Sequence, residues 1–334
     1  MHVGLRVDGG PNIGYGHLMR TGALATELLD RDATLTVATT TPTPAREVFP
    51  STVDVIELPS RADPDPFIEW LDTANPDVVV TDAYPVDTDY QQAVRDRVPL
   101  VVLQDDARHA VCADVFTNGN LYGPELDYEF VGQPPKQCLG ADYVLLRPEI
   151  QARAAGEPPW RGSPERAIIM MGGSDLAELT PTVVRAFDGF DLTVDAIVGP
   201  GCSQTQEQAV RTAASESSTT VEVSRDPDDL VDRMAAADFA VSTASSTTYE
   251  LLALGTPLVS IPIIDNQEPI AAALRQRDAA TVLKRGDGME SFRTAIQEYI
   301  DDADLRRRRG RDGQALVDGG GTERIAATIS RISN

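Results

Sequence analysis

The feature that most constrains this fold is a regular alternation of short apolar runs with amphipathic stretches. Short apolar runs are typical of buried strands, and the stretches between them carry apolar residues at helical spacing. Repetition of strand, helix and strand predicts a parallel sheet covered on both faces, with ligands at the carboxyl ends of its strands. The expected strands are residues 2–7, 35–39, 53–58, 78–81, 100–103, 167–171, 192–198, 220–223, 239–242, 258–261 and 281–283.

One stretch rich in proline and glycine, residues 151–164, interrupts this alternation and is typical of an interdomain linker. A chain of 334 residues is long enough for two domains, each with its own core. We therefore expect an α/β protein with two doubly wound, Rossmann-like domains facing each other across a cleft. Their predicted bounds are 1–150 and 151–334, and the segment 112–140 is less regular.

The charge of the chain limits its partners. Fifty-two acidic residues against 29 basic ones give a net charge of -23. This composition is typical of adaptation to high salt, because salt screens the mutual repulsion of surface carboxylates. A protein binds nucleic acids or anionic membranes through a basic face, so neither is an expected partner of this acidic chain. An anionic ligand must bind through local donors.

Several other classes are disfavoured. The three cysteines lack CxxC spacing, which argues against a disulfide framework and a zinc site. No P-loop, GxSxG motif or metal-ligand cluster is present, so we expect no metal and no cofactor. A secretory signal and a membrane-length apolar run are also missing from the sequence. We expect a soluble, cytoplasmic protein without membrane insertion, and the sequence leaves its oligomeric state open.

The first candidate site is a glycine loop between the first strand and an apolar helical stretch, residues 18–29. Gly14 and Gly16 allow close backbone approach to a ligand. A helix that begins near His17 offers free amide groups and a partial positive charge to an anion. The spacing differs from the dinucleotide GxGxxG motif, so a nicotinamide cofactor is disfavoured.

His17 is the candidate catalytic residue. The chain has three histidines, and the other two, His2 and His109, lack comparable surroundings. Imidazole, with an ordinary pKa of about 6.5, is suited to act as a base near neutral pH. Asp8, at the end of the first strand, could orient His17 or hold substrate. The alternative is that His17 only caps the helix.

The second candidate site follows the strand 239–242. Hydroxyl groups and free amides at a helix start would form a pyrophosphate site without a lysine, and Ser245, Ser246 and Thr247 provide them. Glu250 lies one turn further, where a carboxylate could accept both ribose hydroxyls of a nucleotide. Its alternative role is that of a capping-box glutamate.

Three further sets of polar residues follow predicted strands. Asn266 and Gln267 come after residues 258–261, and they would face the cleft. Gly173 and Ser174 belong to a strand-to-helix turn with the same anion-binding logic. The third set is Asp82 with Tyr84. The pair Asp105 and Asp106 does not suggest a glycosidase, because adjacent strand residues point to opposite faces.

In combination, the motifs resemble the nucleotide-sugar hydrolases of the pseudaminic acid pathway, which act on UDP-2,4-diacetamido-2,4,6-trideoxy-β-L-altrose. The resemblance covers most of the chain, although residues 105–120 follow the family pattern only loosely. Its motifs are Arg6-x-Asp8 with Gly14-x-Gly16-His17-x-x-Arg20, Tyr143-x-Leu-Leu-Arg147-Pro-Glu149, Gly172-Gly-Ser-Asp175-x-x-x-Leu179-Thr180, Ser245-Ser-Thr-Thr-x-Glu250-x-x-x-Leu254-Gly-Thr-Pro257 and Asn266-Gln267.

The resemblance implies a GT-B fold, in which the first domain carries the glycine loop and the second binds UDP. It implies that His17 activates water to attack the anomeric carbon of a UDP-sugar with inversion, without a metal ion. By the same resemblance, Ser245, Ser246 and Thr247 hold the diphosphate, Glu250 holds the ribose, and Asn266 and Gln267 support the nucleotide or sugar. Arg6, Asp8 and Arg20 complete the expected substrate-binding set.

Two other hypotheses remain open. A glycosyltransferase on the same GT-B fold would pass the sugar from a UDP-sugar to a glycan intermediate. Its usual cue, an apolar or basic patch for a lipid acceptor, is not visible in the sequence. A nucleotide-sugar sensor would bind ligand without needing His17.

Overall fold

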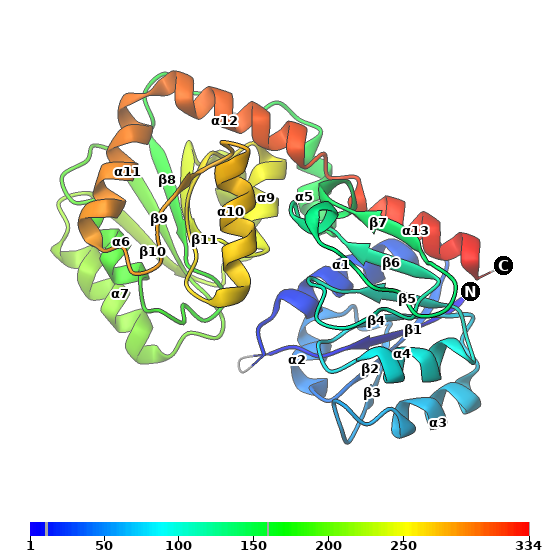
Figure 1. Ribbon diagram of the computed structural model, residues 1–334. Coiled ribbons are helices and arrows are strands. Elements are labelled where there is room, and N and C mark those ends of the chain that lie inside the picture. The colour runs from blue at the N-terminus through cyan, green and yellow to red at the C-terminus, as the bar shows by residue number, and fades with distance from the viewer. Residues whose placement is uncertain (11–12, 159, 334) are drawn as a thin grey trace. The chain divides into compact units, whose positions relative to one another are not determined.

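The structure is a computed structural model that describes residues 1–10, 13–158 and 160–333 (Figure 1). The chain forms two compact units. The first contains residues 1–148 together with 319–334, and the second contains residues 149–318. Each unit is a parallel sheet with helices on both faces, so the expected α/β class with two doubly wound sheets is confirmed.

The sheet of the first unit has seven strands in the order β3-β2-β1-β4-β5-β6-β7. All its named strand pairs are parallel. The order reverses between β1 and β4, and ligands bind at such a switch point in open α/β sheets. The strands are β1 (His2–Val7), β2 (Thr34–Thr39), β3 (Asp54–Glu57), β4 (Val78–Asp82), β5 (Leu100–Leu103), β6 (Val115–Asn118) and β7 (Lys136–Leu139).

Strand alternation divides the first unit into two apolar layers. Val3, Leu5 and Val7 of β1 pack in one layer with residues of α1, α2 and α13. Val79 lies in the other layer, with residues of α3 and α4. The helices are α1 (Gly16–Leu29), α2 (Pro42–Val48), α3 (Asp65–Ala74), α4 (Thr88–Arg95) and α13 (Gly321–Ile332), with short 3₁₀ turns η1 (Gly123–Glu125) and η2 (Ala141–Tyr143).

The second unit has a six-stranded sheet in the order β10-β9-β8-β11-β12-β13, again parallel. Its switch point lies between β8 and β11. The strands are β8 (Arg166–Met170), β9 (Thr193–Val198), β10 (Thr220–Arg225), β11 (Phe239–Thr243), β12 (Leu258–Ile261) and β13 (Thr281–Val282).

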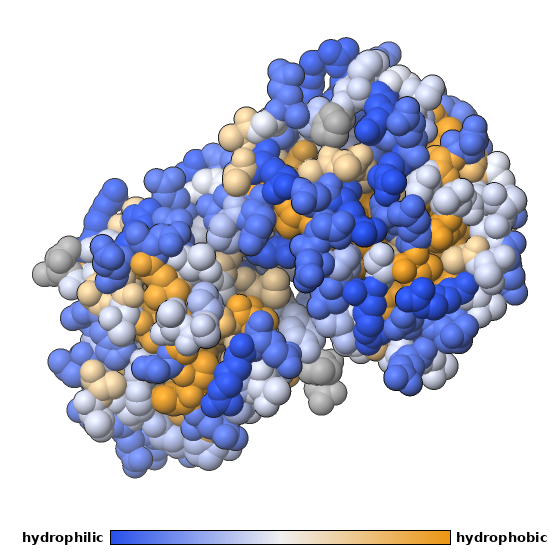
Figure 2. Space-filling view, turned by 180° about the vertical axis from the view of Figure 1, so that it is seen from behind, coloured by the Kyte–Doolittle hydropathy of each residue, from blue (hydrophilic) through white to orange (hydrophobic). Residues whose placement is uncertain are grey.

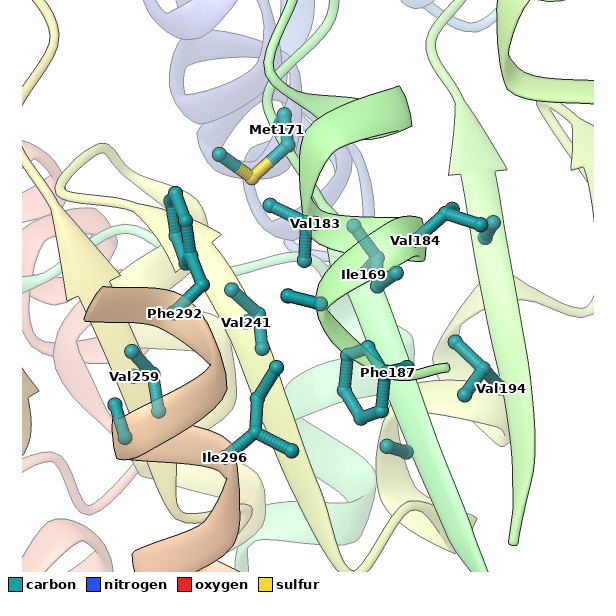
Figure 3. Packing of buried hydrophobic residues seen from close by; sticks show 14 of the residues in the cluster. Ile169, Met171, Val183, Val184, Phe187, Val194, Val241, Val259, Phe292 and Ile296 are labelled. Atoms are coloured by element: carbon teal, nitrogen blue, oxygen red, sulfur yellow. The ribbon is translucent and has the colours of Figure 1, made fainter. Parts of the chain in front are cut away.

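One face of this second sheet carries a continuous apolar core (Figure 3). Phe292 and Ile296 of one helix and Phe187 beside another meet the β8 and β11 side chains Ile169 and Val241. The helices of this unit are α5 (Pro148–Ala154), α6 (Thr180–Ala186), α7 (Gln204–Glu216), α8 (Leu230–Ala236), α9 (Thr247–Leu254), α10 (Glu268–Gln276), α11 (Met289–Asp301) and α12 (Ala303–Leu316), with the 3₁₀ turn η3 (Asp265–Gln267).

The structure differs from the expected organisation in three places. Strands β6 and β7 lie in the segment 112–140, where the sequence predicts only a less regular stretch, and α5 occupies part of the expected linker. Residues 319–334 were expected in the second domain, but they belong to the first unit. The physical reason is the apolar face of α13, since Ile325, Ala326 and Ile329 are buried in the core beside α1.

Hydrophilic residues cover most of the face shown in Figure 2, with smaller apolar areas between them. Within the described part of the chain, no helix is long and apolar enough to cross a membrane.

Candidate active site

The glycine loop connects β1 to α1 through unusual backbone geometry. Gly10 and Gly14 have φ angles of +138° and +97°, which L side chains rarely adopt. The Gly10 N–H donates to the Gly14 carbonyl at 3.0 Å, and the Gly14 N–H donates back at 2.7 Å. A Cβ on Gly9 would lie 2.5 Å from Leu18 Cγ, so α1 packs directly on this turn. Residues 11–12 lie outside the described part of the loop.

His17, in the first turn of α1, is bonded to Asp82 at the end of the adjacent strand β4. The distance from His17 Nδ1 to Asp82 Oδ1 is 2.6 Å, and both side chains are nearly buried. An ionised carboxylate only accepts, so we assign the proton to Nδ1. Nε2 then keeps the lone pair that a general base requires.

Arg20 holds the same carboxylate from the next turn of α1. Its Nε donates to Asp82 Oδ2 at 2.6 Å, and its Nη2 donates to Asp82 Oδ1 at 2.5 Å. The third nitrogen, Nη1, donates to Asp105 Oδ1 at 2.6 Å. All three guanidinium nitrogens of Arg20 therefore donate to carboxylates of the first unit, and Arg20 organises the site around Asp82.

The electrostatics of the site keep Asp82 ionised. Burial acts to raise the pKa of Asp82, but the charges and hydrogen bonds of Arg20 and His17 outweigh it and hold that pKa well below its usual range. Thr21 Oγ1 adds another donor to Asp82 Oδ2 at 2.9 Å. The carboxylate is thus a fixed, charged acceptor for His17 Nδ1, which is the arrangement of an oriented base.

Tyr84 packs against His17 from the loop after β4. The two ring centroids are 4.7 Å apart in an edge-to-face arrangement. The Arg108 guanidinium carbon lies 3.9 Å from the centroid of the Tyr84 ring. His17, Tyr84, Arg108, His109 and other residues line a small pocket of about 10 Å³. This volume is about the space that one water molecule needs.

Asp8 does not orient His17, contrary to one expectation from the sequence. Asp8 accepts hydrogen bonds from the Thr40 N–H at 2.7 Å and from Thr40 Oγ1 at 2.9 Å, and its Oδ2 lies 2.9 Å from Arg6 Nη2. Arg6 and Asp8 are both buried. Because strand side chains alternate, Val7 faces α1, whereas Arg6 and Asp8 lie on the other side. The pair supports the loops after β1 and β2.

Sequence reasoning missed two residues of this network, Asp105 and Asn120. Asp105 follows β5, and Asn120 lies just beyond β6. Asn120 Nδ2 donates to Asp105 Oδ1 at 3.0 Å. A signal existed for Asp105, because it follows the predicted strand 100–103, whereas the strand before Asn120 was not predicted. The missing information was the strand order, which places β5 beside β4.

In the second unit, the expected hydroxyl-rich loop lies between β11 and α9. Ser246 is the N-cap residue of α9 and is exposed, while Ser245 and Thr247 are half-buried. The Thr243 hydroxyl donates to Ser245 Oγ at 3.2 Å. Glu250 is the fourth residue of α9 and Tyr249 the third, so Glu250 does not occupy the capping-box position.

The turn with Gly173 and Ser174 follows β8, which pairs with β11. Its geometry corrects the expectation of a helix start there. Helix α6 begins at Thr180, and the buried Asp175 carboxylate already accepts the N–H groups of Leu179 and Thr180, both at 3.0 Å. Gly173 is exposed, and its carbonyl accepts the Gly201 N–H at 2.8 Å.

Asn266 and Gln267 form part of η3, after β12. Asn266 is exposed, whereas Gln267 is buried and its Oε1 accepts the Ile263 N–H at 2.9 Å. Gln267 therefore stabilises its own loop. Because β8, β11 and β12 are neighbours in the sheet, the three predicted loops of this unit meet at one edge. Within the described residues, no group of His, Cys, Asp and Glu is arranged to hold a metal ion.

Comparison with known proteins identifies a sequence relative that matches almost the whole chain. The chain is 23% identical to the spore coat polysaccharide biosynthesis protein SpsG of Bacillus subtilis (strain 168), and the alignment covers 98% of both chains. No protein-family model matches the chain.

Solved structures resemble nearly the whole chain. MurG of Acinetobacter baumannii superposes with a TM-score of 0.71 at 15% identity, covering 99% of both chains. The calicheamicin glycosyltransferase CalG4 has a TM-score of 0.67 at 17% identity, covering 99% of this chain and 98% of its own. An S. aureus MnaA–UDP structure has a TM-score of 0.63 at 13% identity, with 98% and 96% covered. The expected GT-B architecture is confirmed.

The same comparisons correct the expected enzyme class. The sequence resemblance implied a nucleotide-sugar hydrolase, but the similar structures include glycosyltransferases such as CalG4, and the sequence relative is a biosynthesis protein. A base in the first unit is compatible with either chemistry, since it can deprotonate water or an acceptor hydroxyl. The local motifs therefore could not separate the two classes.

Proposed function

We propose that this protein is a GT-B glycosyltransferase that moves a sugar from a UDP-sugar to a hydroxyl group of a glycan intermediate. The observation that carries the proposal is the His17–Asp82 pair, with its 2.6 Å bond, at the switch point of the first sheet. It provides an oriented base where α/β folds bind ligands.

In this proposal, His17 Nε2 takes the proton of the acceptor hydroxyl. The hydroxyl oxygen forms a bond to the anomeric carbon, the bond from that carbon to the diphosphate oxygen breaks, and UDP leaves. Direct displacement inverts the anomeric centre. Asp82, which accepts from Nδ1, stabilises the imidazolium that forms on His17.

The second unit is the proposed nucleotide-binding unit. At the start of α9, the Thr248 and Tyr249 N–H groups already donate to the Ser245 and Ser246 carbonyls at 2.9 and 3.0 Å. The partial positive charge at this helix end and the hydroxyl groups of the loop therefore suit the charge of a leaving diphosphate better than those two amides do. Ser245, Ser246 and Thr247 would hold the diphosphate, and Glu250, on the first turns of α9, would accept the ribose hydroxyls. The exposed backbone of Gly173 and the side chains of Ser174 and Asn266 are further contacts in this proposal. The similarity to the MnaA–UDP structure supports a uridine nucleotide.

Glycan biosynthesis is the proposed setting, supported by the extensive similarity to the spore coat polysaccharide biosynthesis protein. For the donor, the proposal names a class only, a UDP-linked hexose derivative. A diacetamido-trideoxy sugar, as in the pseudaminic acid pathway, is one donor to include in the test.

The test is a transfer assay with several donors and acceptors in about 1 M potassium chloride, where salt screens the surface charge. Purified protein receives UDP-N-acetylglucosamine, UDP-glucose or a UDP-diacetamido sugar, with and without a membrane-free glycan extract from the source cells. We expect UDP release that depends on the extract, together with transfer of labelled sugar to it.

His17→Ala should lower the transfer rate by about two to four orders of magnitude, because a positioned base contributes that much. His2→Gln is the matched control, since His2 lies at the opposite end of β1 and bonds to Thr36. Equal UDP release without the extract, or full activity of His17→Ala, would contradict the proposal.

A further inference from the structure

Arg20 lies between Asp105 and Asp82, the carboxylate that is bonded to the proposed base His17. Arg20 Nη1 donates to Asp105 Oδ1 at 2.6 Å, while Nε and Nη2 of the same guanidinium hold Asp82. The guanidinium is planar and rigid, so a carboxylate that fixes one of its nitrogens fixes the others. Asp105 is therefore placed to limit the orientations in which Arg20 can hold Asp82.

Asp105 is itself held by the loops after β5 and β6. Asn120 Nδ2 lies 3.0 Å from Asp105 Oδ1 and 2.8 Å from Asn118 Oδ1. The Tyr122 hydroxyl donates to the Asp105 backbone carbonyl at 2.9 Å. Asn118 and Asn120 are buried, so this end of the network is anchored in packed structure.

From this geometry we infer that Asp105 is a positioning residue for the proposed transfer reaction, acting through Arg20 on the Asp82–His17 pair. The inference rests on the proposed function for its kinetic consequences. Its structural part, that Asp105 orders the His17–Asp82 hydrogen bond, does not need any activity.

Charge balance gives Asp105 a second effect on His17. The charged groups that face His17 are Asp82 from β4 and Arg20 from α1, with Asp105 directly behind Arg20. Tyr84 contacts the ring, Arg108 lies over Tyr84, and His109 lines the same pocket. Arg20 and Arg108 are thus surrounded by three carboxylates, Asp82, Asp105 and Asp106, so a neutral residue in place of Asp105 makes the surroundings of the imidazole less negative.

The first test compares Asp105→Asn with wild type across pH under the transfer assay. We expect kcat to fall about tenfold or more, because small displacements of a catalytic group are costly, while KM changes little. The acid limb of the kcat profile, where protonation inactivates the base, should move to lower pH. Asp105→Glu keeps the charge and should keep the wild-type acid limb. Asp72→Asn, which neutralises an exposed carboxylate paired with Arg97, is the matched control.

A double-mutant cycle shows whether Asp105 acts through Arg20. If it does, Asp105→Asn should add little to the loss caused by Arg20→Gln. Additive losses, or an Asp105→Asn enzyme with wild-type kcat and acid limb, would overturn the inference. Asn120→Ala provides a second variant that leaves Asp105 in place, and we expect a smaller loss in the same direction.

A readout without turnover separates this inference from the proposed function. Nitrogen-15 NMR of the histidine rings is feasible because the chain has only three histidines. The His17 Nδ1–H proton, protected by Asp82, should exchange with solvent faster in Asp105→Asn than in wild type or Asp72→Asn. Unchanged exchange would overturn the inference even in an active transferase. Faster exchange in a protein without transferase activity would support the network and refute the proposed reaction.

Discussion

At the scale of single residues, the candidate site depends on which side chain can reach His17. Val78 and Val80 of β4 share the apolar layer of α1, and Asp82 is the next residue of that alternation. The side chain of Asp8, at the end of β1, points to the opposite face of the sheet, so it contacts Arg6 instead. Two carboxylates at neighbouring strand ends therefore have different roles, one orienting the proposed base and one supporting loops.

The buried Asp8 gives a prediction about pH. Burial acts to raise the pKa of Asp8, but the hydrogen bond and charge of Arg6 and the bonds from Thr40 outweigh it and lower that pKa. A lowered folded pKa stabilises the protein above the unfolded value, about 3.9 for Asp, and this stabilisation is lost as pH falls through the folded value. Asp8→Asn should therefore cost about 3 kcal/mol at pH 6, as for other broken buried pairs.

The measurement is urea unfolding of wild type and Asp8→Asn between pH 6 and pH 3. The gap in unfolding free energy should narrow below about pH 4, where the unfolded-state carboxyl begins to protonate. The exposed Asp72→Asn variant controls for simple charge removal. A gap that widens toward low pH would mean that Asp8 is not stabilised in its ionised form.

At the scale of elements, close loop contacts shape the proposed nucleotide site. A Cβ on Gly199, after β9, would lie 2.4 Å from the Gly173 carbonyl oxygen and 2.7 Å from that of Gly172. These are backbone atoms that cannot rotate away. Gly199→Ala should displace the turn after β8 and weaken UDP binding about tenfold or more, as lost positioning usually does.

Titration calorimetry with UDP checks this expectation, with the melting temperature measured in parallel. Gly288→Ala is the control, because a Cβ at Gly288 meets open space and its φ is -106°. Unchanged UDP affinity in a Gly199→Ala protein would place the nucleotide elsewhere.

The last helix supports the first unit, although it follows the second in sequence. Ile325 of α13 is fully buried in the core with α1, and Thr322 Oγ1 accepts the Leu146 N–H at 2.9 Å. Replacing a buried Ile by Ala costs about 2–5 kcal/mol. Ile325→Ala should therefore destabilise the first unit, whereas the exposed Arg331→Ala should not.

The two tryptophans make this prediction measurable for each unit. Trp70 lies in the first unit and Trp160 in the second. In a Trp160→Phe background, Trp70 fluorescence follows unfolding of the first unit, and Trp70→Phe isolates the second. If Ile325→Ala destabilised only the unit whose unfolding Trp160 reports, the assignment of α13 to the first unit would be contradicted.

At the scale of the whole molecule, the net charge of -23 governs stability in different salts. The Debye length is about 10 Å at 0.1 M salt and about 3 Å at 1 M, so repulsion between surface carboxylates is progressively screened. Surface Asp–Arg pairs also weaken, but each of these contributes little. We therefore expect the melting temperature to rise with potassium chloride.

Calorimetry in 0.1, 1 and 2 M potassium chloride measures this effect. Screening saturates, so the gain from 0.1 to 1 M should exceed the gain from 1 to 2 M. A melting temperature that stays level or falls over the first interval would refute salt adaptation through surface charge.

The basic run at residues 306–309 has roles that composition alone does not predict. From composition alone, such a run is expected to form a solvated face or to pair with carboxylates. Arg309 Nη2 does pair with Asp278 at 2.9 Å, but Arg306 is buried and donates to the carbonyls of Arg161 and Gly162. The run therefore includes structural residues that tie α12 to the segment before β8.

The sequence by itself determined the α/β class, the position of most strands and the His17 glycine loop, because these depend on local periodicity and local backbone freedom. It could not determine the partners of His17. Asp82 and Asp105 lie 65 and 88 residues further along the chain, and only the strand order β1-β4-β5 brings them together. Nor could it place α13 in the first unit, since an amphipathic helix specifies that it must bury one face but not against which sheet.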